Sequence, residues 1–367
     1  MVWWMSYLIL WCVSTTNLID LTFYSLSLSG DWRQTLPVVP KGYKSDIIAV
    51  CVTKLSFWHA VNHLRLTVNM RVHNRNDSCS QAQRLQATAF ADWLISVGDG
   101  LLHDPENETV VLPEDLLLPP GRKTIPRLIE SVYKDLDVGR TEAQQIQYHC
   151  NWAILAARNR DVDDLNSAIL HWMTSDMHIF PSADSSVDPS STGMPSNTLF
   201  PSEFLNSINI SGFPLHRLSL KIGCPIMLLR NLDPAAGLCN GTRLVVSQLS
   251  RRVIEAVIMT GPHAGKRSFI PRIPLSSSDN SRLPFNLQRL QFPVQLAFAM
   301  SINKAQGQSI RHLGLYLIEE IFSHGQLYVA LSRAENKADV SILLNDTNAG
   351  LHGMTRNVVY QGVLQTL

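Results

Sequence analysis

The sequence carries almost no net charge. Its 31 Lys and Arg residues and 30 Asp and Glu residues leave a formal net charge of +1 over 367 residues. The strongly basic composition that is typical of proteins that coat nucleic acid is therefore absent. This absence weakens a nucleic-acid hypothesis only slightly, because a protein can also hold nucleic acid in a local groove.

Cysteine is scarce and its spacing is irregular. No CxxC pair and no Cys/His cluster occurs, so the ligand spacing of a structural zinc site is missing. We expect reduced, mostly structural thiols in an intracellular compartment, and no structural metal. The six cysteines are Cys12, Cys51, Cys79, Cys150, Cys224 and Cys239.

No apolar run is long enough to cross a membrane as a helix. The most apolar stretch, Met1–Val13, is shorter than the roughly 20 residues that a span needs, and Asp20 interrupts its continuation. No Lys or Arg precedes Arg33, so the positive region of a signal peptide is also missing. We interpret residues 1–28 as an apolar leader of doubtful origin, a displaced or misread segment. A membrane anchor is the weaker alternative.

A phosphate-binding loop is also missing. The pattern GxxxxGK[ST] does not occur, and the 28 residues before Ser29 contain no Asp-Glu pair. The nearest imitation, Gly261–Ser268 (GPHAGKRS), is one residue short and lies between two expected strands, Val253–Met259 and Ser268–Ile273. A phosphate loop needs a strand before it and a helix after it, so we expect a hairpin turn here instead.

The chain nevertheless has the composition of a folded protein. Hydrophobic residues make up 45% of it and charged residues 17%. These values are typical of globular domains, and 367 residues suggest two or three of them.

A strand–helix–strand pattern lies near the C-terminal end. Val294–Ala299, Leu313–Leu317 and Val340–Leu344 are short apolar runs typical of buried strands, and Phe322–Leu331 has apolar residues at helical spacing. We expect the three strands, with Trp152–Ala157, to be neighbours in one mostly parallel sheet.

Polar residues follow these elements where they end, which is where parallel sheets bind ligands. A lysine, amides and a glycine suit a phosphate or a sugar–phosphate backbone, and an arginine suits a bidentate phosphate contact. By composition alone, an ordinary α/β unit with polar loops would be the favoured interpretation. The residues concerned are Ser301, Asn303, Lys304, Gln306, Gly307 and Arg333.

Two strings in this region resemble the fifth and sixth motifs of superfamily-one helicases. SINKAQGQS and GQLYVALSRA are similar to those of the Pif-type (petite integration frequency) DNA helicases, including the helicase part of helitron transposons. The resemblance implies that Ser301, Asn303 and Lys304 bind single-stranded DNA. It also implies that Gln306 and Gly307 bind nucleotide, with Lys304 and Gln306 coupling DNA to it. Arg333 would be an arginine finger at the γ-phosphate.

Three further strings extend the resemblance. SGDWRQTLPVVP (Ser29–Pro40) resembles the third motif, which implies that Gln34 senses the γ-phosphate, and LRLTVNMR (Leu64–Arg71) resembles the fourth, which implies that Arg71 contacts the nucleotide. LKIGCPIMLLRNLDPAAGLCNGTRL resembles helitron-type members, in which it belongs to a small SH3-like barrel. Without the resemblance, Gln34 would be a turn residue and Arg71 a solvated surface arginine.

The implied fold is α/β: a RecA-like parallel sheet of the P-loop NTPase type with an inserted SH3-like β-barrel, the first RecA-like domain being incomplete. Phe180–Asn197 is rich in Ser, Pro and Asp and is expected to be a mobile loop. The expected divisions are 1–28 leader, 29–70 remnant of the first RecA-like domain, 71–150 helical and loop connection, 151–220 with 291–350 second RecA-like domain, 221–290 barrel, and 351–367 tail.

The implied activity is ATP-dependent 5′→3′ DNA unwinding with Mg²⁺, by a monomer that closes around ATP and binds single-stranded DNA and no membrane. The family serves DNA repair, recombination, and telomere or helitron transposon replication, in the nucleus or the mitochondrion. Because the phosphate loop and the acidic metal motif are absent, we expect an N-terminally truncated and inactive fragment. The alternative is a non-catalytic remnant that binds single-stranded nucleic acid.

Overall fold

The computed structural model describes residues 7–12, 25–39, 42–56, 58, 62–70, 80–102, 104, 108–118, 124–136, 139–187, 200–210, 212–277, 283, 285–344 and 353–364. The chain divides into two compact units, Met1–Lys123 with Ala305–Leu367 (unit 1) and Thr124–Lys304 (unit 2). Each unit buries its own set of apolar side chains.

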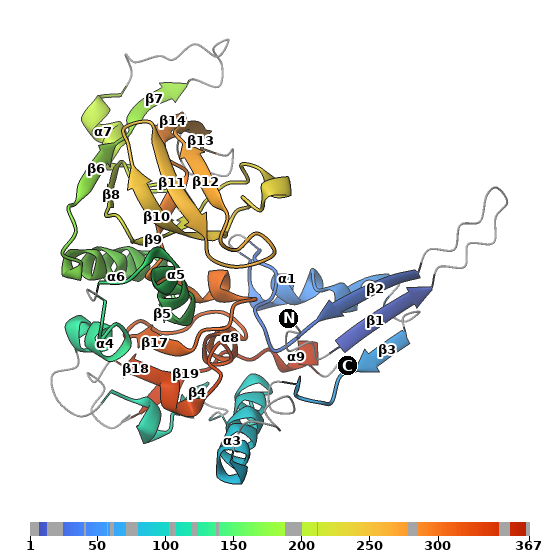
Figure 1. The fold of residues 1–367 in the computed structure, drawn as a ribbon. Helices are drawn as coiled ribbons and strands as arrows, with labels where there is room; N and C mark the ends of the chain where they lie inside the picture. The colour runs from blue at the N-terminus through green and yellow to red at the C-terminus, as the bar shows by residue number, and fades with distance from the viewer. Residues whose placement is uncertain are drawn as a thin grey trace. The chain divides into compact units, whose positions relative to one another are not determined.

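Unit 2 begins with helices around a parallel strand pair and continues into antiparallel strands (Figure 1). Its elements are α4 (Ile125–Val132), α5 (Glu142–Asn151), β5 (Trp152–Ala156), α6 (Asn159–Trp172), β6 (His178–Pro181), β7 (Ala183–Val187), α7 (Ser202–Ser207), β8 (Arg217–Leu220), β9 (Pro225–Leu228), β10 (Arg243–Leu249), β11 (Val253–Ile258), β12 (Arg267–Pro271), β13 (Ile273–Ser276), β14 (Asn286–Gln291), β15 (Val294–Leu296) and β16 (Ala299–Ser301).

The α/β part of unit 2 is the parallel pair β5–β16, covered by α6. Ile154 and Leu155 of β5 and Leu165 of α6 are fully buried, as expected for a strand with both faces covered. Asn166 of α6 fixes the edge strand: its Nδ2 donates to the Ala299 oxygen at 3.0 Å, and its Oδ1 accepts from the Ala299 nitrogen at 2.8 Å. The predicted strand Trp152–Ala157 is thus confirmed as far as Ala156, where β5 ends.

The antiparallel part of unit 2 is a five-stranded sheet in the order β12-β11-β10-β9-β15. Asn240-Gly241 lies in the turn between β9 and β10, where Gly241 has a φ of 89° that suits glycine. Gly261–Ser268 connects β11 to its antiparallel partner β12, so the predicted hairpin is confirmed there. The SH3-like class of this sheet stays a prediction.

Two smaller sheets complete unit 2: β6 pairs with β8, and β14 lies between β13 and β7. The prediction of a loop from Phe180 is wrong as far as residue 187, because β7 pairs with β14. Arg289 of β14 explains the pairing: its Nη2 lies 2.7 Å from Asp184 Oδ2 of β7, and both side chains are buried. The remainder of that predicted loop, 188–197, lies outside the described residues.

The predicted strand Val294–Ala299 is wrong in part. Its first half, β15, pairs antiparallel with β9 in the five-stranded sheet, and only Ala299 and the following residues, as β16, pair parallel with β5. Between them the Ala297 nitrogen donates to the Pro225 oxygen, so the chain leaves one sheet and enters the other without a loop. Continuous apolar character cannot reveal such a change of partner, since both halves are buried.

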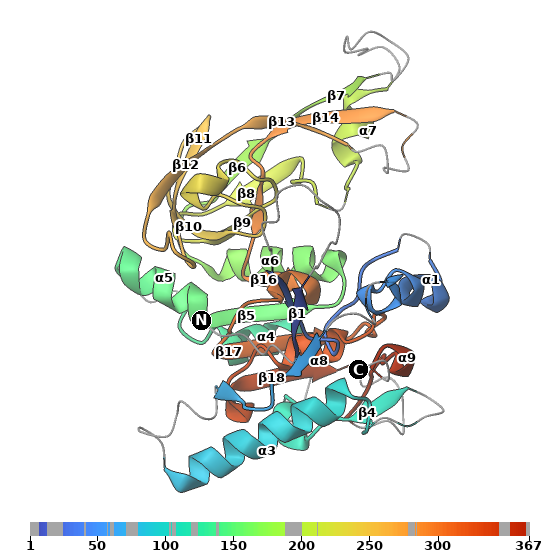
Figure 2. The ribbon, with the colours of Figure 1, turned by 90° about the vertical axis from the view of Figure 1, so that its right-hand side faces the viewer.

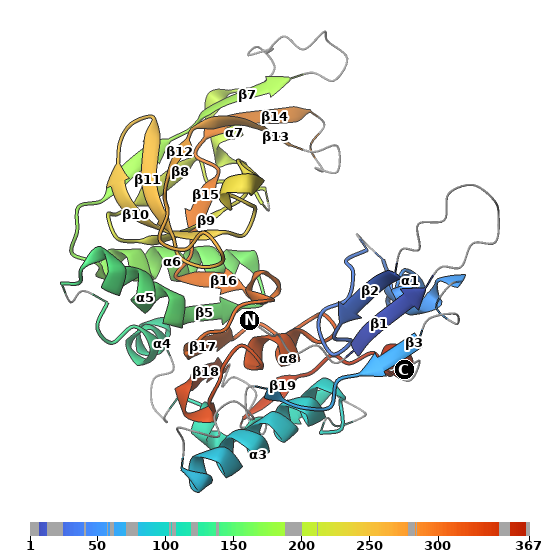
Figure 3. The same ribbon diagram turned by 45° about the vertical axis from the view of Figure 1, so that its right-hand side comes forward.

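Unit 1 combines elements from the two ends of the chain (Figures 2 and 3). Its elements are β1 (Tyr7–Cys12), β2 (Ser25–Gly30), α1 (Lys44–Ala49), β3 (Asn62–Arg65), α3 (Gln81–Gly98), β4 (Thr109–Val111), β17 (His312–Leu317), α8 (Gln326–Leu331), β18 (Val340–Leu344), β19 (Met354–Arg356) and α9 (Gln361–Leu364).

The predicted strand–helix–strand unit is confirmed in β17, α8 and β18, with β17 and β18 paired in parallel. All six residues of α8 are buried, so its apolar side chains fill the unit's core. Helix α8 begins at Gln326, four residues after the predicted start. The long helix α3 packs against α8.

The N-terminal part of unit 1 forms an antiparallel sheet in the order β2-β1-β3, and β4 pairs with β19 (Figure 1). Helix α1 ends at Ala49, and the 3₁₀ turn Val52–Lys54 follows it. The β-branched residues Val52 and Thr53 disfavour continuation of the helix. The helices in the described ranges fall short of the length and apolarity that a membrane span requires.

Candidate nucleotide and nucleic-acid sites

The segment Asp31–Gln34 is held firmly in unit 1. The Tyr328 hydroxyl of α8 donates to Asp31 Oδ2 at 3.0 Å, and His324 Nε2 lies 2.8 Å from the Trp32 oxygen. Arg33 pairs with Asp99 at the end of α3, with its Nε 2.7 Å from Oδ1 and its Nη2 3.0 Å from Oδ2. Three successive residues are thus tied to α8, to the turn before it and to α3.

Two glycines permit this close approach. Gly325, the N-cap of α8, has a φ of 68°, and a Cβ added there would lie 2.7 Å from the Gln34 carbonyl carbon. A Cβ on Gly98 of α3 would lie 2.7 Å from Arg33 Cδ and 2.8 Å from Tyr328 Cδ2. Any larger residue would push the segment away from the helices.

Gln34 meets the turn that carries Gln306 and Gly307. Gln306 Nε2 donates to Gln34 Oε1 at 3.3 Å, across 272 positions of sequence. Gln306 and Gly307 are exposed, and Gly307 has a φ of 84°, so the amides lie at an accessible turn. The structure therefore brings together two residues that the sequence singles out as nucleotide contacts.

Arg333 is in the same unit but its guanidinium is buried, with 2% of the residue exposed. Its Nε donates to the Val329 oxygen at 2.9 Å, and its Nη2 donates to Ser332 Oγ at 2.8 Å. The side chain thus folds back onto the end of α8. Its γ-phosphate role stays a prediction, and Arg71 lies outside the described residues.

Burial and charge tune the groups around Asp31. Burial raises the pKa of the Tyr328 hydroxyl, and the Asp31 charge raises it further, so Tyr328 stays a neutral donor. Burial also lowers the pKa of His324, against the opposing effect of the Trp32 carbonyl. His324 Nδ1 accepts from the Tyr360 nitrogen at 2.8 Å, so the proton belongs on Nε2, facing Trp32.

Lys304 and its neighbours form the second candidate site, in unit 2. Asn303 and Lys304 lie in a 3₁₀ turn, Ile302–Ala305, directly after Ser301 at the end of β16; Asn303 is exposed, whereas Ser301 and Lys304 are half-buried. Lys304 lines a cavity of about 710 Å³ bounded by α6, β15 and the segments Asn209–Ile210, Gly212–Leu215 and Arg217–Ser219. A lysine at a cavity of this size suits a phosphate of an extended polymer.

Asp163 of α6, which lines the same cavity, is a residue that the sequence reasoning missed. Burial lowers the pKa of Lys304 and the Asp163 charge raises it, whereas burial and Asp164 raise the pKa of Asp163. Asp163 therefore competes with any phosphate for Lys304. No sequence signal identifies it, since α6 carries acidic residues along its solvent side.

His324 and Tyr328 were also missed as partners of the Gln34 segment. Their positions within FSHGQLYVALSRA, immediately around Gly325, were the available signal. Among the described residues, no three His, Cys, Asp or Glu side chains gather in a way that could hold a metal ion.

Two family models match separate parts of the chain. The model of PIF1-like helicases matches residues 21–108, which contain the Gln34 segment. The model of the DNA helicase Pif1 2B domain matches residues 203–249, which contain β8, β9 and β10 of unit 2.

Individual relatives agree with these models. Human ATP-dependent DNA helicase PIF1 is 35% identical over 133 residues, which are 34% of this chain and 19% of that protein. ATP-dependent DNA helicase PIF7 of Trypanosoma brucei brucei is 24% identical over 354 residues, 86% of this chain and 32% of that protein. The chain thus spans a fifth to a third of the length of these curated relatives.

A solved structure shares the fold. The crystal structure of Pif1 helicase from Candida albicans matches with a TM-score of 0.53 and 21% identity, covering 92% of this chain and 66% of that chain. The RecA-like α/β fold is therefore supported over most of the sequence. Both family models and the helicase motifs point the same way: over residues 21–108 and 203–249 the chain is similar to the Pif1-type family of superfamily-one, ATP-dependent DNA helicases.

Proposed function

We propose that this chain provides the γ-phosphate sensor and part of the single-stranded DNA grip of an ATP-dependent DNA helicase. The observation that carries the proposal is the hydrogen bond between Gln34 and Gln306. It joins a predicted γ-phosphate sensor to a turn that lies two residues after the predicted DNA contact, Lys304. The backbone between Lys304 and Gln306 thus connects the proposed DNA contact directly to the proposed nucleotide contact.

At the nucleotide, the two glutamines supply neutral amide donors. Gln306 Nε2 is directed at Gln34 Oε1, and Gln34 Nε2 lies 3.4 Å from Asp31 Oδ2. We infer that a γ-phosphate oxygen would take over these weakly bonded amides as a better acceptor. To act as an arginine finger, Arg333 would have to give up its hydrogen bonds to Val329 and Ser332 and bind the phosphate instead.

At the DNA, Lys304 is the proposed phosphate contact, with Ser301 and Asn303 as its polar neighbours. Its ammonium group lies within the electrostatic reach of Asp163, so binding of a phosphate replaces one anion by another. Asp163 keeps Lys304 charged when no DNA is bound, and it competes with the phosphate so that the strand can dissociate.

ATP is the proposed substrate, and groups that match its γ-phosphate end occur among the described residues, in Gln34, Gln306 and Arg333. The printed sequence has no GxxxxGK[ST] loop, and the described residues offer no acidic cluster for Mg²⁺. The described residues therefore do not fit the metal. We propose that the 367-residue polypeptide alone does not hydrolyse ATP at a family-typical rate.

Lys304→Ala tests the DNA part of the proposal. The variant should bind a single-stranded oligonucleotide more weakly and with a log–log salt slope reduced by about 0.7, the value for one lost phosphate contact. Lys266→Ala, which removes an exposed lysine from the β11–β12 turn, is the matched control and should change neither. Equal affinity and equal slope for Lys304→Ala and the parent would remove Lys304 from the binding surface.

A non-catalytic, single-strand-binding protein is the second candidate. The buried, internally bonded Arg333 favours it, because such a guanidinium contributes to folding without any nucleotide. The 5′→3′ direction, the monomeric state, the nuclear location and the roles in repair, recombination, telomere maintenance or helitron transposition are proposals carried by the family resemblance.

A further inference from the structure

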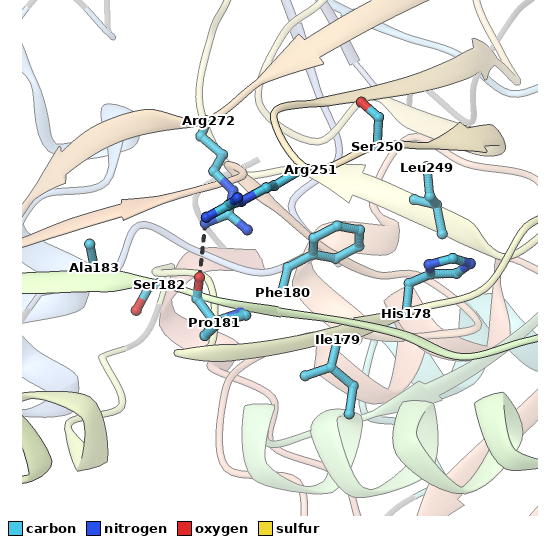
Figure 4. Close-up of a pocket in the computed structure, with 10 residues that line it drawn as sticks. All are labelled: His178, Ile179, Phe180, Pro181, Ser182, Ala183, Leu249, Ser250, Arg251 and Arg272. Atoms are coloured by element: carbon cyan, nitrogen blue, oxygen red, sulfur yellow. Dashed lines mark hydrogen bonds between the residues drawn. The ribbon is translucent and has the colours of Figure 1, made fainter.

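A second cavity of unit 2, about 460 Å³ in volume, shares no lining residue with the cavity at Lys304. Figure 4 shows its walls: strand β6 and the residues after it on one side, and the turn between β10 and β11 with Arg272 on the other. None of the motifs identified in the sequence contributes to it. Its chemistry therefore requires a separate explanation.

Two arginines face this cavity. Arg251 and Arg272 line it, and none of its described lining residues is Asp or Glu. Arg272 Nη1 donates to the Pro181 oxygen at 2.8 Å, which holds the guanidinium at the wall (Figure 4). Burial lowers the pKa of Arg272 and the Arg251 charge lowers it further, so the two cations repel each other. An anion between them would remove that repulsion.

Aromatic rings lie beside the cations. The His178 and Phe180 rings are stacked, with centroids 6.4 Å apart and an interplanar angle of 17°. The Arg272 guanidinium lies 5.8 Å from the Phe180 centroid and 5.0 Å from that of Phe292. Phe180 is buried whereas His178 is exposed, so a free ring face adjoins the cationic pair.

We propose that this cavity binds single-stranded nucleic acid, with a backbone phosphate between Arg251 and Arg272 and the adjoining base on the His178 ring. A cationic pair beside an exposed ring is the combination that holds single strands without reading their sequence. The volume accommodates about one nucleotide. The site rests on the proposed function only for the class of ligand, since it uses none of the same residues.

The alternative explanation is that Arg251 is a solvated residue of a hairpin turn. The neighbouring Arg252 is exposed as well and does not line the cavity, so it provides a matched comparison. Under the proposal the two arginines differ in function. Under the alternative they are equivalent.

The experiment is photocrosslinking of a 15-nucleotide oligothymidylate containing 5-iodouracil to the full 367-residue chain, followed by peptide mapping. We expect a crosslink in the peptide that contains His178–Phe180. Arg251→Glu should reduce its yield about tenfold, the effect of losing one charge-assisted phosphate bond, whereas Arg252→Glu should leave it within about twofold. Lys304→Ala should leave this crosslink in place and weaken only crosslinks to the peptide around Lys304.

Three results would overturn the proposal. One is crosslinking around Lys304 with none at His178–Phe180, which would retain the proposed function and remove this site. Another is an equal loss with Arg251→Glu and Arg252→Glu, which would indicate a diffuse charge effect. The last is complete suppression by thymidine monophosphate at the same nucleotide concentration, which would assign the cavity to free nucleotides.

Discussion

At the residue scale, Gly325 decides whether the Gln34 segment can lie against α8. Its φ of 68° and the closeness of the Arg33–Gln34 backbone both exclude a side chain. Gly325→Ala should therefore lower the free energy of unfolding by roughly 2–4 kcal/mol, combining backbone strain with overpacking. Gly261→Ala, at a φ of 87° with open space around it, should lose only about 1 kcal/mol. Equal losses in urea titration would show that the close approach contributes nothing.

His324 gives this segment a predictable pH dependence. Its folded-state pKa is lowered, so the unfolded chain binds more protons and stability falls as the pH drops below the unfolded value of about 6.5. The loss should reach at most about 1.4 kcal/mol per pH unit until the folded pKa is passed. His324→Gln should flatten the fall in melting temperature between pH 7.5 and 5.5. His149, whose pKa burial lowers to about 3, contributes equally to both proteins. Parallel curves for variant and parent would exclude a titrating His324.

At the element scale, two buried tyrosines differ in whether the hydroxyl group makes a hydrogen bond. The Tyr133 hydroxyl, just after α4, donates at 2.6 Å to the Phe298 oxygen, where the chain passes from β15 to β16. The Tyr148 hydroxyl of α5 is buried without a partner among the described residues. Tyr133→Phe should cost about 1 kcal/mol of unfolding free energy, whereas Tyr148→Phe should be neutral or stabilising. The opposite order in chemical denaturation would contradict this assignment.

Local sequence patterns predict where the strands and helices lie better than they predict which strands pair. Strand β18 occupies the predicted residues, Val340–Leu344. Its run of apolar residues is a local property of the sequence, so it could be predicted without knowing the partner strand. Val294–Ala299 is equally apolar, yet its halves join different sheets, a choice made by distant strands. Helix α1 likewise ends for a local reason, because the β-branched residues Val52 and Thr53 follow it.

At the scale of the whole molecule, the motifs predicted the candidate nucleotide contacts but not the residues that hold those contacts in place. Gln34 and Gln306 were identified from separate strings, and their contact depends on Arg33, Tyr328 and Gly325, none of which carries the predicted chemistry. The Arg251–Arg272 pair was not predicted, because it lies at a hairpin turn and a strand end that are unremarkable in sequence. Its significance comes only from the cavity that tertiary structure forms.

The central claim is that the chain carries the sensing part of a helicase ATPase and not its phosphate-holding part. DNA-stimulated ATP hydrolysis measured on two polypeptides tests it most directly. The 367-residue chain should show no stimulation, because no phosphate loop occurs in its sequence. The same chain fused behind the phosphate-loop and acidic-motif region of an intact relative should hydrolyse ATP. Arg333→Ala in that fusion should lower the rate by about 10³-fold or more. Robust hydrolysis by the 367-residue chain alone, abolished by Arg333→Ala, would contradict the account.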